Sequence, residues 1–327
     1  MADSTRAGSL IWGNLLHLSY NMWDDHVHAN ARSPYVMYTP HLRFDESLWN
    51  DLLTQMVDAG MNMVVLDLGD GVLYDSHPEI AVANAWTPDK LRAELAKMRT
   101  MGLEPIPKLN FSTAHDAWLA EYSRMVSTAR YYEVCRDLIR EVITLFDTPR
   151  LFHLGMDEET CAHQRDFEYV VVRQKDLWWR DLAFYVGELE RAGSRAWVWS
   201  DYVWHHPEDF YSRMPKSVVQ SNWYYLSRFA DDREAGEPIP CEYEQAYRAY
   251  LDLNDRGYDQ IPTASNWTTP DNMEATVRFC TKHIAAERLL GFLQTPWRPT
   301  LEACRPRHED AIRQVRAARE GQGVERR

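Results

Sequence analysis

The chain has 327 residues, of which 45% are hydrophobic and 26% charged, and its formal net charge is −13. This is the composition of a globular protein, and an acidic chain without a block of lysine and arginine is a poor partner for nucleic acid or an anionic membrane. Five scattered cysteines without a CxxC pair indicate reduced thiols rather than a disulfide framework or a zinc site. The first residues, MADSTRAGSL, lack the apolar stretch of a signal peptide, and no run is long enough to span a membrane. We therefore expect a cytoplasmic protein with no membrane partner.

Short apolar runs alternate with amphipathic stretches along the chain. Strands are predicted at 10–20, 61–68, 103–111, 150–157, 195–201, 217–223, 259–267 and 288–295. Helices are predicted between them at 45–60, 87–102, 130–146, 173–193, 241–257 and 271–287, with a last one at 305–319. Eight such units predict an α/β fold, a single-domain (β/α)8 TIM barrel over residues 10–320, with flexible tails at 1–9 and 321–327. An open doubly wound sheet fits less well, because no GxGxxG follows the first strand.

Aromatic and polar residues gather where the predicted strands end. In a (β/α)8 barrel the active site lies at the carboxyl ends of the strands. Flat rings stack on the C–H faces of sugars, and polar groups bind the hydroxyls, so these residues predict a carbohydrate site. The candidate substrate-binding residues are Tyr20, Asn110, Trp199, Asp201, Asn222, Trp223, Tyr224, Trp267 and Trp297.

The fourth predicted strand, RLFHLGMDEE, ends in three acids. Side chains alternate along a strand, so His153, Gly155 and Asp157 share one face, and Glu158 reaches the mouth where the strand bends into its loop. Hydrolysis of a glycosidic bond needs an acid for the leaving oxygen and a second group for the developing positive charge. From the residues alone, this acid pair fits either catalysis or the start of a solvated loop.

A resemblance to a known family favours catalysis. The stretch FHLGMDEE is similar to the His-x-Gly-Gly-Asp-Glu signature of family-20 glycoside hydrolases, the β-N-acetylhexosaminidases, with Met156 at the second glycine. MNMVVLDLGDG resembles the second strand of that family and ends near Asp70, and MGLEPIPKLNFSTAH resembles its third strand and following turn, with His115. VWSD, VVQSNW and TPW resemble its tryptophan-bearing strands 5, 6 and 8.

The resemblance implies an exo-acting, retaining β-N-acetylhexosaminidase in which the substrate's own acetamido oxygen attacks C1 and forms an oxazolinium intermediate. Asp157 would orient the acetamide, Glu158 would act as general acid and then as base, and Asp70, His115 and His153 would support them. Glu158 must hold a proton near neutral pH, which a neighbouring carboxylate favours. The expected partner is an amino-sugar-containing oligosaccharide or glycoconjugate, with neither metal nor cofactor, and the sequence favours no particular oligomeric state.

Several features depart from the family. Its members usually carry a further domain before the barrel, and they place an arginine after strand 1, where this chain offers residues 20–23. The glutamate that follows the family's strand 8 tryptophan is absent, since Trp297 precedes Arg298, and the strand 7 tyrosine could be replaced by Tyr224 or Asn266. The chemistry at C1 and C2 is therefore expected to be kept and recognition of O3, O4 and O6 to be changed, with a lean towards N-acetylgalactosamine.

Two other interpretations are open. The pair His26-x-His28 after the first strand is typical of metal-dependent amidohydrolases, and His205 or His206 could add a ligand. The end of the sixth strand has no histidine, however, and the end of the eighth has no aspartate. A non-catalytic carbohydrate-binding barrel would keep the tryptophans but would not need the acid pair.

Overall fold

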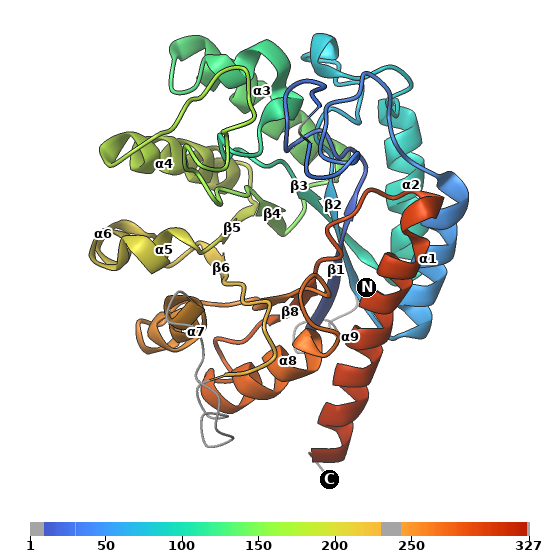
Figure 1. Cartoon of the computed structure of the whole chain (residues 1–327), viewed down its shortest axis with the longest axis vertical. Helices are drawn as coiled ribbons and strands as arrows, with labels where there is room; N and C mark the ends of the chain where they lie inside the picture. The colour runs from blue at the N-terminus through green and yellow to red at the C-terminus, as the bar shows by residue number, and fades with distance from the viewer. Residues whose placement is uncertain (1–9, 30, 230–242, 326–327) are drawn as a thin grey trace.

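The computed structural model describes residues 10–29, 31–229 and 243–325. Parallel strands form one sheet in the order β6-β5-β4-β3-β2-β1-β8-β7, and parallel bridges from Gln220 to Gln260 and from Trp223 to Thr263 join the two ends (Figure 1). The sheet is thus a nearly closed barrel, and the predicted (β/α)8 fold is confirmed. The strands are β1 (Ile11–His17), β2 (Met63–Asp67), β3 (Glu104–Lys108), β4 (Leu151–His153), β5 (Arg195–Trp199), β6 (Val219–Ser221), β7 (Thr263–Ala264) and β8 (Gly291–Gln294).

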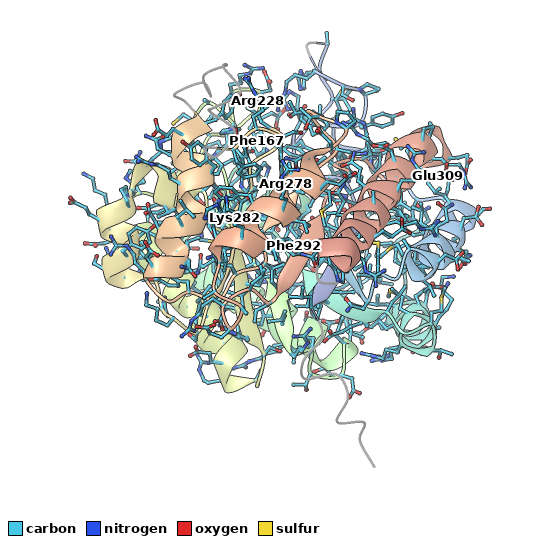
Figure 2. The ribbon with its side chains drawn as sticks, turned by 90° about the horizontal axis from the view of Figure 1, so that it is seen from below. Phe167, Arg228, Arg278, Lys282, Phe292 and Glu309 are labelled. Carbon is cyan, nitrogen blue, oxygen red and sulfur yellow. The ribbon has the colours of Figure 1, made fainter. Side chains whose placement is uncertain are left out.

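Helices surround the strands on the outside (Figure 1). They are α1 (Glu46–Asp58), α2 (Pro88–Thr100), α3 (Ala129–Leu145), α4 (Asp176–Arg191), α5 (Tyr202–His205), α6 (Pro207–Arg213), α7 (Glu244–Asp255), α8 (Asn272–His283) and α9 (Arg305–Glu325). Seen from below, α8 and α9 lie side by side, with Phe292 of β8 beneath them (Figure 2). Among the described helices, none has both the length and the apolar character needed to cross a membrane.

The sequence prediction differs from the structure in three places. Most strands are shorter than predicted, because their carboxyl ends turn into loops as soon as they reach the rim of the barrel. Helices α5 and α6 lie where none was predicted, and α9 continues to Glu325, into the segment expected to be a tail. The predicted tail at 1–9 and the start of the helix predicted at 241–257 lie outside the described residues.

The core forms two layers, one on each side of the sheet. Side chains of one parity, such as Leu15, Val65 and Trp197, fill the barrel interior, and those of the other parity, such as Leu16 and Leu66, face the helices. This alternation means that the last inward-facing residue of each strand lies directly beneath the loops at the carboxyl end. Those residues form the floor of the candidate site.

Candidate active site

The loop after β4 carries the acid pair in an unusual backbone conformation. Gly155, Met156 and Glu158 all have positive φ, at 71°, 76° and 53°. A Cβ atom on Gly155 would lie 1.8 Å from Oδ1 of Asn110, so only glycine fits there. The same Oδ1 accepts a hydrogen bond from the Met156 amide at 3.3 Å, and Nδ2 of Asn110 donates to Oδ1 of Asp157 at 3.0 Å. Asn110, a predicted binding residue, therefore holds the acid loop in place.

Asp157 is buried and carries a stable negative charge. Nε2 of His115 lies 3.4 Å from its Oδ2, and the hydroxyl of Ser112 donates to its backbone carbonyl. Burial alone would raise the pKa of Asp157, but the charge of His115, the ammonium of Lys108 and the Asn110 amide outweigh it and lower that pKa to about 2. Asp157 is therefore a carboxylate at any pH at which the protein would work.

Glu158 lies between two imidazoles. Nε2 of His115 is 3.2 Å from its Oε2, and Nε2 of His163 is 3.5 Å from its Oε1. The Glu158 side chain is 25% exposed, whereas that of Asp157 is 9% exposed, so Glu158 is the acid that solvent reaches more readily. The Glu158 amide donates to Oδ2 of Asp201 at 2.9 Å, which fixes the start of the side chain.

His115 is the cation that joins the two acids. It is buried, and burial would lower its pKa, but Asp157 first and Glu158 next raise that pKa to about 10. The ring also meets the indole of Trp23 edge to face at 4.7 Å. A protonated His115 beside two carboxyl groups explains how a strand can end in acids inside a buried pocket, because each charge has a partner.

The floor beneath the acids is a polar layer inside the barrel. Lys108 forms a buried ion pair with Asp67, and Nε2 of His17 lies 3.8 Å from the same carboxylate. His153 accepts a hydrogen bond from the Gly155 amide at 3.0 Å, and its ring packs 4.3 Å from that of Trp199. Burial and the nearby Lys108 hold the pKa of His153 well below its usual range, so this ring is neutral. The predicted supporting residue His153 thus contacts the acid loop from below.

Aromatic side chains form one wall of the site. Trp297, Trp199 and Trp23 lie together, with ring centres 5.9 and 6.2 Å from Trp297. The hydroxyl of Tyr20 donates to the Trp297 carbonyl at 2.9 Å, and the indole N–H of Trp297 donates to the hydroxyl of Tyr225 at 3.0 Å. These contacts come from the ends of β1, β5, β6 and β8, so the strand-end rule correctly brought distant aromatic residues together.

Four predicted site residues have contacts that differ from those expected: Asp70, Tyr224, Trp267 and Asn222. Asp70 is buried, and its hydrogen bonds come from Ser19 and Asn21 at the end of β1, so Glu158 receives its direct contacts from the two histidines instead. Burial raises the pKa of Asp70 to about 7.

Tyr224 is buried in the core between Phe229 and Tyr247, and its hydroxyl donates to the Arg228 carbonyl at 2.6 Å. The next residue, Tyr225, is the one that faces Trp297. Trp267 is half exposed, with the guanidinium of Arg298 4.7 Å from its ring.

Asn222 acts through other residues. It is buried, and its Oδ1 accepts from the indole of Trp204 at 2.9 Å while its Nδ2 donates to the Ala246 carbonyl at 2.6 Å. It therefore fixes Trp204, whose ring meets that of Trp223 at 4.4 Å.

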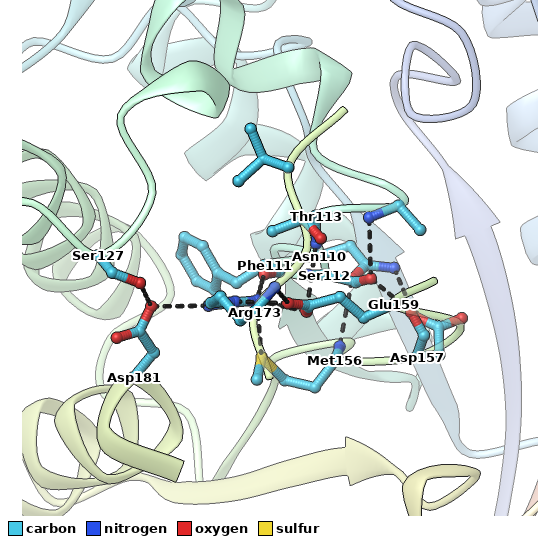
Figure 3. Close-up of polar contacts among 12 residues, drawn as sticks. Asn110, Phe111, Ser112, Thr113, Ser127, Met156, Asp157, Glu159, Arg173 and Asp181 are labelled. Atoms are coloured by element: carbon cyan, nitrogen blue, oxygen red, sulfur yellow. Dashed lines mark hydrogen bonds and ion pairs between the residues drawn. The ribbon is translucent and has the colours of Figure 1, made fainter. Parts of the chain in front are cut away.

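A buried arginine anchors the far side of the acid loop. The guanidinium of Arg173 binds Glu159 through two hydrogen bonds, of 2.8 and 2.7 Å, and also contacts Asp181 at 3.1 Å and the Phe111 carbonyl at 2.5 Å (Figure 3). Its Nη2 lies 3.8 Å from the sulfur of Met156. Arg173, Glu159 and Asp181 have almost no exposed side-chain surface. The residue after the acid pair is thus tied to the loop after β3 and to α4.

The arrangement of possible metal ligands differs from that of an amidohydrolase. Within the described ranges, the group of residues whose ligand atoms lie within 4.8 Å of one another is His115, Asp157 and Glu158. His28 instead lies 3.0 Å from Asp24, and His26 lies 2.8 Å from Asp25, both in the loop after β1. The predicted His-x-His pair is therefore not part of this three-residue group.

Sequence reasoning missed Tyr225, His163 and Arg173. Tyr225 follows the predicted sixth strand within the stretch WYY, so an aromatic signal was present, but the wrong tyrosine was chosen. His163 and Arg173 lie in a long loop without periodicity, where only the fold brings them to the acids.

No protein-family model and no curated protein sequence matches this chain. Several solved structures share its fold. A GH20 exo-β-N-acetylglucosaminidase from Vibrio harveyi in complex with N-acetylglucosamine has a TM-score of 0.57 at 13% identity, over 93% of this chain and 54% of that one. A β-N-acetylhexosaminidase from Bacteroides fragilis has a TM-score of 0.59 at 13% identity, over 93% of this chain and 65% of that one. Dispersin B has a TM-score of 0.59 at 14% identity, over 95% of this chain and 99% of its own.

At these identities the likeness establishes a shared barrel fold. The structural neighbours are the same family that the strand-end motifs resemble, so the resemblance is confirmed at the level of fold. The chain spans about half of the Vibrio protein and about two thirds of the Bacteroides protein.

Proposed function

We propose that the chain is a glycoside hydrolase that removes terminal β-linked N-acetylhexosamine with retention of configuration. One observation carries the proposal: the buried carboxylate of Asp157 and the more exposed carboxyl group of Glu158 both contact Nε2 of His115, at 3.4 and 3.2 Å, beside an aromatic wall. The fold shared with β-N-acetylhexosaminidases supports it.

In the first step, the acetamido oxygen of the substrate attacks C1 and the bond from C1 to the leaving oxygen breaks. Asp157 accepts a hydrogen bond from the acetamide N–H, and its negative charge offsets the positive charge of the oxazolinium ring. Glu158 transfers its proton to the leaving oxygen. In the second step, a water attacks C1, the carboxylate of Glu158 takes its proton, and the acetamide is restored.

Tyr225 would bind the acetamido oxygen. Burial and the nearby charges of Glu158 and Asp157 raise the pKa of its phenol, so it stays protonated and can donate a hydrogen bond. Trp199 and Trp297 would enclose the acetamido methyl group and the sugar ring. A sugar with an axial O4, N-acetylgalactosamine, is the proposed preference, since the arginine that the family places after strand 1 and the glutamate that it places after the strand 8 tryptophan are absent from those two positions.

The test compares p-nitrophenyl β-N-acetylgalactosaminide, β-N-acetylglucosaminide and plain β-galactoside. We expect hydrolysis of the acetamido sugars alone, and a fall in kcat of about 10²- to 10⁴-fold in Glu158→Gln and in Asp157→Asn. Glu168→Gln, an exposed acid in the same loop, is the matched control and should behave like the parent. Hydrolysis of the plain galactoside would rule out participation of the acetamide. Inactivity on all three substrates would rule out the proposed function.

A further inference from the structure

A groove of about 630 Å³ opens beside Glu158, between the loop after β4 and helix α5. Under the proposed function, Glu158 gives its proton to the glycosidic oxygen, so the leaving group must lie next to this residue. The groove is the space available there. Its lining includes Glu158, His163, Lys175, Trp204, His206 and Trp223.

An aromatic pair gives the groove a surface suited to a sugar ring. Trp204 and Trp223 meet edge to face at 4.4 Å, and both are partly exposed. Asn222 holds the indole N–H of Trp204 at 2.9 Å, so the orientation of the ring is fixed before a ligand binds. Rigid indoles offer flat apolar area to C–H groups at little entropic cost.

Each acid that lines the groove has a partner or is neutral, and Glu158 lies beside His115 and His163. Glu159 pairs with Arg173, and Asp209 accepts from the indole of Trp179 and lies 3.5 Å from Arg213. Asp201 is buried, and burial followed by the charge of Asp157 raises its pKa to about 8, so it is mostly neutral at pH 7.

Arg173 and His163, which also line the groove, contact Glu159 and Glu158, whereas the lysine of the lining has no such partner. Lys175 is exposed, and no carboxylate in the described part of the chain lies within ion-pair distance of its ammonium. Three histidines, His163, His205 and His206, add imidazole nitrogens to the same lining. Complementary charge at a binding groove selects partners and speeds their arrival.

We propose that this groove binds the leaving group of the substrate and favours an acidic sugar, one that carries a carboxylate or a sulfate placed against Lys175. The proposal rests on the proposed function and adds to it the chemical class of the sugar on the leaving side.

The experiment uses matched disaccharides with the preferred N-acetylhexosamine linked β to glucuronic acid, to its methyl ester, to glucose or to glucose sulfate. The acid and its ester differ in charge and by one methyl group, and the sulfated and plain glucosides differ by the charged sulfate group, so the two pairs distinguish carboxylate from sulfate recognition. We expect kcat/KM to be about fivefold higher for at least one anionic substrate than for its neutral partner, and to fall towards parity as salt is raised.

Variants identify the residue responsible. Lys175→Gln should reduce the anionic preference to about one, and Lys175→Arg should keep it. Lys90→Gln removes the same charge from α2, outside the groove, and should also keep it. A ratio near one for both pairs in the parent, or a preference that survives in Lys175→Gln, would overturn this proposal. Loss of activity on the p-nitrophenyl acetamido sugars would instead contradict the proposed function itself, so the two failures are distinguishable.

Discussion

The buried guanidinium of Arg173 gives the sharpest test of how the acid loop is held. We predict that Arg173→Met destabilises the protein and lowers activity, although the guanidinium of Arg173 bonds to Glu159, Asp181 and the Phe111 carbonyl rather than to the acid pair. Breaking a buried ion pair by removing one partner typically costs about 3–5 kcal/mol, because the other charge stays buried and unpaired.

The remaining contacts of Glu159 and Asp181 (Figure 3) put the expected loss in free energy of unfolding at the lower end of that range. After the change, Glu159 would keep the backbone amides of Arg173 and Thr113, at 2.9 and 3.4 Å, and Asp181 would keep the hydroxyls of Ser127 and Tyr132. We therefore expect a loss of about 3 kcal/mol, or a fall of about 6 °C in Tm at roughly 2 °C per kcal/mol. Thermal unfolding followed by circular dichroism measures it.

The chain offers a matched control on its surface. Arg150 binds Glu104 through two hydrogen bonds of 2.7 and 2.8 Å, the same geometry, but its side chain is 53% exposed. Arg150→Met should cost less than about 1 kcal/mol. The double variant Arg173→Met, Glu159→Gln should recover part of the stability lost in Arg173→Met, because it removes the unpaired charge. Equal effects of Arg173→Met and Arg150→Met would refute this reasoning.

Two further predictions concern the site. Because Asp157 is the charge that contributes most to raising the pKa of His115 to about 10, NMR titration should find this imidazole protonated up to about pH 9, and Asp157→Asn should lower its pKa. The pKa of His115 is higher in the folded than in the unfolded protein. Its contribution to the free energy of unfolding is therefore complete below about pH 6.5 and is lost as the pH rises through about 10. A free energy of unfolding that does not fall over this pH range would contradict the assignment. Tyr225→Phe should lower kcat/KM for acetamido sugars by about 10²-fold, the cost of one lost donor to developing charge, while Tyr122→Phe, a tyrosine bonded to Glu79 at 2.6 Å, should not.

The barrel could be predicted because apolar runs of strand length alternate with amphipathic helices. The acid pair could be predicted to lie at the rim because it follows the end of β4, although Gly155 and Met156, with positive φ, break the strand alternation before Asp157. The alternation of side chains along a strand no longer predicts which way they point once the strand has ended. Strand β6 ends at Ser221, so alternation could not tell whether Tyr224 or Tyr225 would face the site.

Long-range pairing was the other gap in the prediction. Asp70 and His115 both lie near the rim, as expected, but the sequence does not specify that Asp70 bonds to Ser19 and Asn21. Arg173 was placed at the start of a helix, yet α4 begins at Asp176, because the preceding residues fold back to reach Glu159. At Met156 the backbone keeps the conformation that the glycine of the family signature would favour. Its φ is 76°, although the residue carries a side chain.

The junction between β6 and β7 has a consequence for how a sugar could enter. Strand β2 pairs with β1 over its whole length, from Met63 to Asp67, whereas β6 and the β7 segment are joined through the isolated bridges at Gln220 and Trp223. Sheets open first where their backbone hydrogen bonds are fewest. We expect transient widening of the barrel to occur at this junction, which carries Trp223 and, two residues later, Tyr225. Such widening would then move Trp223 and Tyr225, while Asn110 and Arg173 hold the loop after β4 that carries Asp157 and Glu158.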